Sequence, residues 1–568
     1  MMKILGRRVS LLLLFLMLSL LLIQSIPATL AQETKLGGTF IFALSGDPTH
    51  LNPGISGSMP ITFTGMNIYN QLIQWGENVE PVPQLAESWT ISEDGLAYTF
   101  NIVRNATWHD GKPLTSEDVK VSYEEVIIFH SSTGPILKTY LDSIETPDDY
   151  TVTFRLKTVF SPFMFVFGAP FGCVLPAHLY KGTDVLNNPH NNDPIGTGPF
   201  KFVEWVKGDH ITLERNENYW KKDKPYLDRI VFKIIPESAT RVLAMENHEI
   251  DYDLQWPSSA WQEVFSGVDI VKRNQFQALG LFLIFNLDHP ILSDVRVRQA
   301  FRYAVDPDVV VQGATFGSWN RFKTHFHSGV SWVIKPDMDI YEDSPNVEKA
   351  NQLLDEAGYP KGPDGVRFTV ELMMLAGRYE HQKTGEVVRD QMKAVGVDVQ
   401  LAPTEYATYF EIRDKEEFDM ITSIMGTGPD LNIGAARLYV SYYFHAQLWN
   451  YNNSKVDQLF EQAVAEIDRE KAKLLWYECQ DILAEDMPML PLLEQTWVVA
   501  YSQDFVGLPT CGSLEEPLDS VWWVKGEAIL TPWEEWVQSY GLYVVVIAIV
   551  VVAVAVGLVF YRRRTAKA

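Results

Sequence analysis

Few residues of this chain stand in a pattern that could support catalysis or bind a metal ion. His325 and His327, two residues apart, could form half of a metal site, but such a pair is more often part of an exposed loop. His109 precedes Asp110 in a predicted turn, where a structural role is favoured over acid–base chemistry. The sequence contains no HExxH, GxSxG or dinucleotide-binding motif. It therefore predicts a protein that is not an enzyme and that needs no cofactor.

Aromatic residues are the other group that could contact a ligand. The chain has 16 tryptophans and 24 tyrosines, and flat rings can pack on the apolar faces of sugars. Tryptophan also fills cores and interfaces, which is its commoner use. Composition alone leaves a sugar-binding role and a structural role open.

The stretch Gln84–Val126 predicts the element around which the chain is organised. An Asp-Gly pair at Asp94 predicts a tight reversal between two strands, and apolar residues recur at every second position after it. Thr115 stands three residues before Asp118, which predicts a capping box at the start of a helix. This stretch is therefore a predicted hairpin that leads into a helix.

Three segments, taken together, resemble one known family. The first is LAESW…DG-YTF…WHDGKPLTSEDV within Gln84–Val126, the second is PIGTGPF at Pro194–Phe200, and the third is LFLIFN at Leu281–Asn286. A phosphate-binding loop is excluded for the second segment, because no Gly-Lys-Ser/Thr follows it. The pattern resembles the large extracytoplasmic solute-binding proteins of peptide, oligopeptide and nickel ABC importers, known as family 5.

An α/β fold is predicted from the residues themselves. Strands at Phe368–Leu372 and Val397–Leu401 flank a helix at Glu380–Val395, which is the βαβ unit of a doubly wound lobe. The resemblance further implies a type II periplasmic-binding-protein fold, with two lobes, a hinge and an extra domain. The predicted domains are domain I (35–66, 195–272 and 495–530), domain II (67–194) and domain III (273–494).

The resemblance also implies where a ligand lies. It places hinge crossings near Gln275–Gly280 and Leu493–Val499, and ligand contacts in the loop Leu44–Asp47 and the segment Phe418–Asp430. Peptide-binding relatives usually carry a Trp in this last segment and an Asp that pairs with the peptide amino group; here Trp is absent and Asp430 lies slightly late. Tyr442 and Tyr443 could add stacking faces. The predicted ligand-binding residues are Leu44, Ser45, Gly46, Phe282, Tyr406, Tyr409, Met425, Gly426, Thr427, Asp430 and Trp497.

Both ends of the chain carry membrane-targeting signals. Basic residues, an apolar run and small residues near Ala31 predict a signal peptide over 1–31. Residues 542–560 are uncharged and mostly Val, Ile and Ala, and three arginines follow them, which predicts a transmembrane helix with a cytoplasmic tail at 561–568. The binding domains are then extracellular and the protein is anchored by a single pass. A C-terminal anchor in place of a lipid is similar to an archaeal arrangement.

The net charge bears on nucleic-acid binding, and the cysteines and two asparagines bear on covalent modification. A formal net charge of −25 argues against nucleic-acid binding. Cys173, Cys479 and Cys511 allow at most one disulfide, and Asn105 and Asn452 have the form of glycosylation acceptors.

The sequence thus predicts the receptor of an ABC importer, which captures peptides by lobe closure and delivers them to the permease and ATPase subunits. An oligosaccharide receptor of the same family is the alternative, and nickel or another chelate comes third. A surface-anchored hydrolase or a sensor ectodomain is the reading from a different class.

Overall fold

A computed structural model of the chain describes residues 35–76, 80–131, 133–168, 172–274, 278–428, 430–508, 518–523 and 527–528. The chain forms two compact units. One comprises 1–37 and 522–568, and its described strands are β1 (Lys35–Leu36), β22 (Trp522–Trp523) and β23 (Glu527–Ala528), of which β1 and β23 pair antiparallel. The other comprises Gly38–Val521.

The predicted signal peptide, transmembrane helix and tail lie outside the described residues. Within the described part of the chain, no helix has the length and apolar character needed to cross a membrane.

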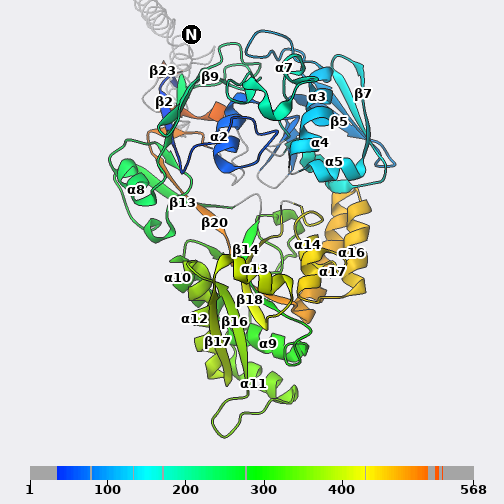
Figure 1. Ribbon diagram of the computed structural model, residues 1–568, viewed down its shortest axis with the longest axis vertical. Helices are drawn as coiled ribbons and strands as arrows, with labels where there is room; N and C mark the ends of the chain where they lie inside the picture. Colours follow the sequence, from blue (N-terminus) through cyan, green and yellow to red (C-terminus); the bar gives the residue numbers. More distant parts are fainter. Residues whose placement is uncertain are drawn as a thin grey trace, which may run out of the picture. The chain divides into compact units, whose positions relative to one another are not determined.

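A seven-stranded mixed sheet forms one part of the large unit (Figure 1). Strand β2 is parallel to both of its neighbours, β11 and β12, and the other pairs are antiparallel. The strand order is β13 (Val268–Asn274), β20 (Thr496–Ser502), β12 (Tyr252–Asp253), β2 (Thr39–Leu44), β11 (Arg229–Ile234), β10 (His210–Arg215) and β9 (Phe200–Val206).

Two helices cover this sheet on opposite faces. The ring of Phe42 packs 5.4 Å from that of Phe63 in α2 (Met59–Ile68), whereas the adjacent Ala43 shares a core with Met245 of α8 (Ser238–Glu246). Neighbouring side chains on a strand point to opposite faces, so α2 and α8 lie on different sides of β2.

A six-stranded sheet forms a second part of the large unit. Its strands, in order, are β15 (Asn320–Arg321), β19 (Met489–Glu494), β14 (Leu279–Phe285), β18 (Met420–Gly426), β16 (Phe368–Leu375) and β17 (Val397–Thr404). Alternate residues of β14 belong to two cores: Leu281 and Leu283 face one, and Phe282 and Ile284 face the other. Such a fully apolar strand is typical of a sheet that is covered on both faces.

The helices divide between these two cores (Figure 1). The first core takes side chains from α9 (Val295–Ala304), α10 (Pro307–Thr315), α11 (Val347–Glu356) and α12 (Tyr379–Ala394). The second takes them from α13 (Tyr406–Asp414), α14 (Ala436–Tyr439), α15 (Phe444–Leu448), α16 (Ser454–Ala465) and α17 (Arg469–Asp486).

The third part is a four-stranded antiparallel sheet in the order β5 (Ala86–Ile91), β6 (Ala97–Ile102), β8 (Thr151–Leu156) and β7 (Leu141–Asp148). Its helices are α3 (Ser116–Val121), a π-helix at Ser122–Ile127, α4 (Ile128–His130), α5 (Gly134–Tyr140), α6 (Phe165–Gly168) and α7 (Ala177–Tyr180). The remaining short strands of the large unit are β3 (Ile73–Trp75), β4 (Pro81–Pro83) and β21 (Phe505–Val506).

The predicted hairpin and helix start are confirmed. β5 and β6 pair across a turn at which Gly95 has φ +69° and donates its amide to the Ser92 carbonyl, 2.8 Å away. The capping box of Thr115 and Asp118 is present at the start of α3. The predicted βαβ unit is also confirmed, because β16 and β17 are parallel and α12 lies between them in sequence. The α/β fold class is therefore correct.

Candidate functional site

Two chain crossings join the seven-stranded sheet to the six-stranded sheet. We call the parts built on these sheets the first lobe and the second lobe. β13 leads toward β14, and β19 leads into β20 through Gln495. The amide of Gln495 donates to the carbonyl of Leu279 (2.9 Å), so the crossings are hydrogen-bonded to each other. They fall within the predicted hinge segments Gln275–Gly280 and Leu493–Val499, of which residues 275–277 lie outside the described part.

The predicted second-lobe ligand segment, Phe418–Asp430, runs along β18 and reaches this hinge at the end of the strand. Gly426, at the end of β18, pairs with Leu279 of β14, and the amide of Thr427 donates to the carbonyl of Ala278 (3.1 Å). The side chain of Thr427 is fully buried, whereas that of Met425 is partly exposed. The structure therefore brings Met425, Gly426 and Thr427 together at the hinge end of the six-stranded sheet.

Asp430 lies four residues beyond the end of β18 and is almost completely buried. Its carboxylate accepts a hydrogen bond from the amide of Asn432 (2.8 Å). Burial raises the pKa of Asp430 to about 6, while the amide donors of Asn432 and the positive charge of Arg469 act in the opposite direction. A carboxylate with such a pKa is charged at neutral pH.

Asn432 was missed by the sequence analysis. Its side chain is also buried, and its Oδ1 atom has no hydrogen-bond partner among the residues that the structure describes. A buried acceptor without a partner costs free energy, so this position favours a ligand that donates hydrogen bonds. The only signal in the sequence was its spacing, two residues after Asp430, which is typical of an Asx turn.

The first-lobe loop follows β2. Leu44 is buried and its carbonyl accepts from the amide of Ile235 (2.8 Å), while Ser45 is exposed and Gly46 is partly exposed. The next residue, Asp47, fixes the loop because its carboxylate accepts from the indole of Trp205 (2.9 Å). Ser45 and Gly46 thus form a short exposed loop between two anchored ends.

Trp497 lies on β20 directly after the hinge crossing. Its side chain is partly exposed, and its ring packs edge-on against Phe63 of α2 at 6.4 Å. Phe63 is buried against Phe42, so the position of the Trp497 ring is set by the first-lobe core. The ring is supported on one side and retains accessible surface.

The remaining predicted residues differ strongly in exposure. Phe282 and Tyr409 are fully buried in the second lobe, where Phe282 packs 5.0 Å from Phe322 and the Tyr409 hydroxyl donates to the Thr422 carbonyl (2.8 Å). Tyr406, one turn from Tyr409 on α13, is 66% exposed. The structure therefore places Phe282 and Tyr409 in the core and Tyr406 on the surface.

The histidines singled out in the sequence occupy structural positions, and the exposed loop expected for His325 and His327 is wrong. His325 and His327 are buried, and their Nε2 atoms lie 3.2 Å from the Met489 carbonyl and 3.4 Å from the Gln495 carbonyl. His109 bonds the backbone of the GTGPF segment, with Nε2 3.0 Å from the Gly198 carbonyl. Among the described residues, no group of three or more His, Cys, Asp or Glu side chains is arranged to hold a metal ion.

The cysteine and glycosylation predictions are partly covered by the structure. Cys173 and Cys479 are buried, free thiols, and Cys511 lies outside the described residues. Asn105 and Asn452 are exposed.

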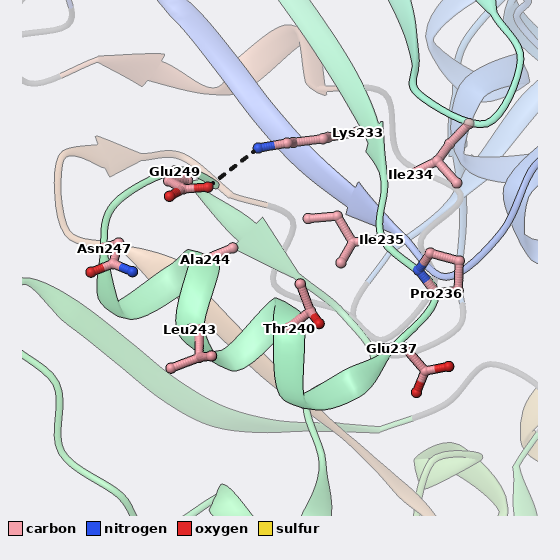
Figure 2. Close-up of a pocket in the computed structure, with 10 residues that line it drawn as sticks. All are labelled: Lys233, Ile234, Ile235, Pro236, Glu237, Thr240, Leu243, Ala244, Asn247 and Glu249. Carbon is pink, nitrogen blue, oxygen red and sulfur yellow. Dashed lines mark ion pairs between the residues drawn. The ribbon is translucent and has the colours of Figure 1, made fainter.

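The first lobe also has a groove at the end of β11 (Figure 2). It is formed by the end of β11, the segment after it and α8, and has a volume of about 420 Å³. Lys233 and Glu249 form an ion pair of 3.5 Å at its edge, and Leu243 lies exposed on α8. None of the predicted ligand-binding residues lines this groove.

Comparisons with known proteins agree with the two-lobed architecture. Residues 80–445 match the model of the bacterial extracellular solute-binding proteins, family 5 Middle. The oligopeptide-binding protein AppA of Bacillus subtilis is 28% identical over 81% of this chain and 86% of the relative, and heme-binding protein A of Haemophilus influenzae is 27% identical over 81% and 88%.

A solved structure of Bacillus subtilis AppA in complex with a nonapeptide superimposes with a TM-score of 0.62 at 26% identity, covering 86% of this chain and 100% of AppA. The match to the family model covers more than half of the chain, and the predicted fold and motifs agree with it. The chain belongs to family 5 of the extracellular solute-binding proteins of ABC importers.

Proposed function

We propose that this receptor captures peptides or oligopeptides outside the cell and holds them by the amino terminus. The observation that carries the proposal is the pair formed by the buried carboxylate of Asp430 and the unpartnered Oδ1 of Asn432. Both groups accept hydrogen bonds, and the carboxylate of Asp430 is negatively charged. An ammonium group supplies three donors and a positive charge, so it matches this pair.

The relatives support a peptide ligand. One related protein is named for oligopeptides and has been solved with a nonapeptide, and another is named for heme. Members of the family therefore differ in their ligand, and the choice for this chain rests on its own residues.

The ligand contacts are proposed on both sides of the hinge. Ser45, Gly46 and Trp497 contribute from the first lobe, and Met425 and Asp430 contribute from the second. Leu44, Gly426 and Thr427 act through their backbone, and the buried Phe282 and Tyr409 support the wall behind them. Closure of the lobes would enclose the ligand, and the equilibrium would shift because the closed form has the higher affinity.

An oligosaccharide is the second candidate. Tyr406, Tyr442 and Tyr443 are 66%, 55% and 40% exposed on the second lobe, and the Trp497 ring is partly accessible. Exposed aromatic faces of this kind suit sugar rings as well as apolar peptide side chains.

The domains, partners and cellular location that we propose are those predicted from the sequence. We propose the three domains with the predicted boundaries, no catalytic activity and delivery to an ABC permease and its ATPase. We also propose an extracellular receptor held by a single C-terminal helix, an arrangement of the archaeal type. These proposals are supported by the apolar run at 542–560, the arginines after it and the family membership.

A thermal-shift panel on the full chain tests the ligand class. The ligands are peptide mixtures, the same peptides with acetylated amino termini, cello- and malto-oligosaccharides, and Ni²⁺. A ligand that binds only the folded protein stabilises it by about 2.7 kcal/mol at a hundredfold excess over Kd. Stabilisation by free peptides and not by acetylated ones supports the proposal. Stabilisation by sugars alone would favour the second candidate, and stabilisation by acetylated peptides to the same extent would contradict the role of Asp430.

A further inference from the structure

A second cavity lies beside the hinge and contains none of the predicted ligand-binding residues. Its volume is about 420 Å³, within the range of small-molecule sites. Charged and polar side chains from both lobes line it, among them Lys272, Asp308, Arg321, Lys323, Ser328 and Glu494. We call this cavity the hinge pocket.

The strand order places the hinge pocket and the predicted ligand loops on opposite sides of the crossings. In the second lobe, β15 and β18 flank the crossing strands β19 and β14; the pocket is next to β15, and the predicted ligand segment follows β18. In the first lobe, Lys272 lies on the edge strand β13, whereas the loop at Leu44 follows β2, three positions along the sheet. Trp497, on the neighbouring strand β20, pairs with Arg273, so its side chain lies on the face of the sheet opposite to that of Lys272. The hinge pocket and the proposed solute contacts therefore use different side chains.

Two lysines from different lobes line this pocket, and neither forms a close ion pair with a described carboxylate. Lys272 Nζ donates to the Gly317 carbonyl and lies 4.6 Å from the centre of the Trp261 ring, and burial lowers its pKa. Lys323 is exposed at the rim. Within the described part of the chain, neither ammonium lies within 4.0 Å of a carboxylate, so both are available to an anion.

The other charges of the pocket are already compensated. Arg321 is held by both oxygens of Asp339 at 2.8 and 2.6 Å and lies 3.6 Å from Asp308. Glu494 is 3% exposed and accepts hydrogen bonds from the Ser328 amide (2.8 Å) and hydroxyl. Burial raises the pKa of Glu494 to about 7, while the Ser328 hydrogen bonds and the positive charges of Lys323 and Arg321 act in the opposite direction. Near neutral pH, a proton on this carboxyl group weakens its repulsion of an anion.

We propose that the hinge pocket binds a small anion with a carboxylate or phosphoryl group, held between Lys272 of the first lobe and Lys323 of the second. Because the anion contacts both lobes at the hinge, it restrains the angle between them. The cavity would thus be an effector site that acts on lobe closure and is separate from the solute site.

Calorimetric titration of the full chain with inorganic phosphate and with succinate, at constant ionic strength set by chloride and without peptide, tests this proposal. Saturable binding of either anion is expected, and the anion that binds identifies the source of the charge. Lys272→Gln and Lys323→Gln should each weaken binding about tenfold, the effect of losing one charge-assisted hydrogen bond.

The matched controls are Lys207→Gln in the first lobe and Lys393→Gln in the second, which remove the same charge from exposed positions outside the pocket. These variants should keep the wild-type affinity. The proposal is overturned if neither anion saturates, if only one of the two pocket lysines matters, or if the controls lose as much affinity. Melting temperatures without anion show whether each variant is folded, and because peptide is absent, the result does not depend on the proposed function.

Discussion

The two sides of the hinge each contain a buried carboxyl group, but its neighbours differ. On the side of β18, Asp430 lies next to Asn432, whose Oδ1 is an unpartnered acceptor within the described structure. On the side of β15, Glu494 shares its pocket with Lys272 and Lys323, two cations that lie more than 4.0 Å from any carboxylate among the described residues. Burial raises the pKa of both acids.

The comparison separates what burial does from what the neighbours do. Desolvation alone makes either acid easier to protonate and does not determine the ligand. The neighbouring groups determine the kind of ligand. An acceptor without a partner favours a hydrogen-bond donor such as an ammonium group, whereas cations favour an anion. Under the two proposals, a buried carboxyl group therefore lies in sites for ligands of opposite charge on the two sides of one hinge.

The largest effect is expected for Glu494→Gln. The folded pKa of Glu494, about 7, is above its ordinary value of 4.5, so the folded protein carries an unfavourable buried charge above pH 7 and not below pH 4.5. Removing that charge should raise the free energy of unfolding by about 3 kcal/mol near pH 8, and the gain should fade as the pH falls from 7 to 4.5. Urea denaturation at several pH values measures this difference.

The control for this prediction is Glu263→Gln, an exposed carboxylate of the first lobe. Its stability should differ little from the wild type at every pH. An equal gain for Glu494→Gln at acidic and alkaline pH would show that something other than the buried charge is responsible. Peptide affinity should not change, because Glu494 lies on the side away from the proposed solute contacts.

The next effect concerns ligand affinity and uses Asp430→Asn. Loss of the charged acceptor should weaken binding of free-amine peptides by about 2 kcal/mol, roughly 30-fold. Wild-type affinity should also fall as the pH drops through 6, since the protonated carboxyl group no longer attracts an ammonium. Calorimetry with free and acetylated peptides measures both effects, and Asp142→Asn, at an exposed position on β7, is the matched control. Unchanged affinity in Asp430→Asn would remove this residue from the site.

The parts of the fold that could be predicted from the sequence are those with local signals. The hairpin at Gly95 and the capping box at Thr115 and Asp118 depend on residues a few positions apart, and both are present. The βαβ unit of β16, α12 and β17 likewise follows from the periodic apolar residues of three consecutive segments. The resemblance added the family and the two hinge segments, which no local pattern specifies.

The hinge pocket could not be predicted in this way. Glu494 and Ser328 are hydrogen-bonded although they are 166 residues apart in the sequence. Lys272, on a strand of the first lobe, donates to the Gly317 carbonyl of the second lobe. Side-chain burial could not be predicted from the sequence either. Tyr406 and Tyr409 are three residues apart on one helix, yet Tyr406 is 66% exposed and Tyr409 is fully buried. Which side chains of α13 face a core depends on how this helix packs against the rest of the lobe, and the local sequence does not determine that packing.

A smaller effect is expected for Trp497→Leu. The substitution removes the edge-on ring pair with Phe63, worth about 1 kcal/mol, together with the accessible face proposed to contact the solute. Solute affinity should therefore fall by a comparable amount, whether the solute is a peptide or a sugar. Trp89→Leu is the control, because Trp89 is also partly exposed and packs 6.5 Å from Phe100 in the four-stranded sheet. Equal losses of solute affinity in the two variants would count against a contact at Trp497.

The smallest change in stability is expected for Tyr406→Ala, and it distinguishes the two proposed ligand classes. The Tyr406 side chain is largely exposed, so its removal should alter the free energy of unfolding by no more than about 0.5 kcal/mol. Tyr409→Phe, on the same helix, should instead cost about 1 kcal/mol, because it deletes the hydroxyl that donates to the Thr422 carbonyl. If the solute is a sugar that stacks on the exposed tyrosines, Tyr406→Ala lowers its affinity and leaves the fold intact. If the solute is a peptide held at Asp430, the same variant keeps most of its affinity, and a large loss would point back to an aromatic site.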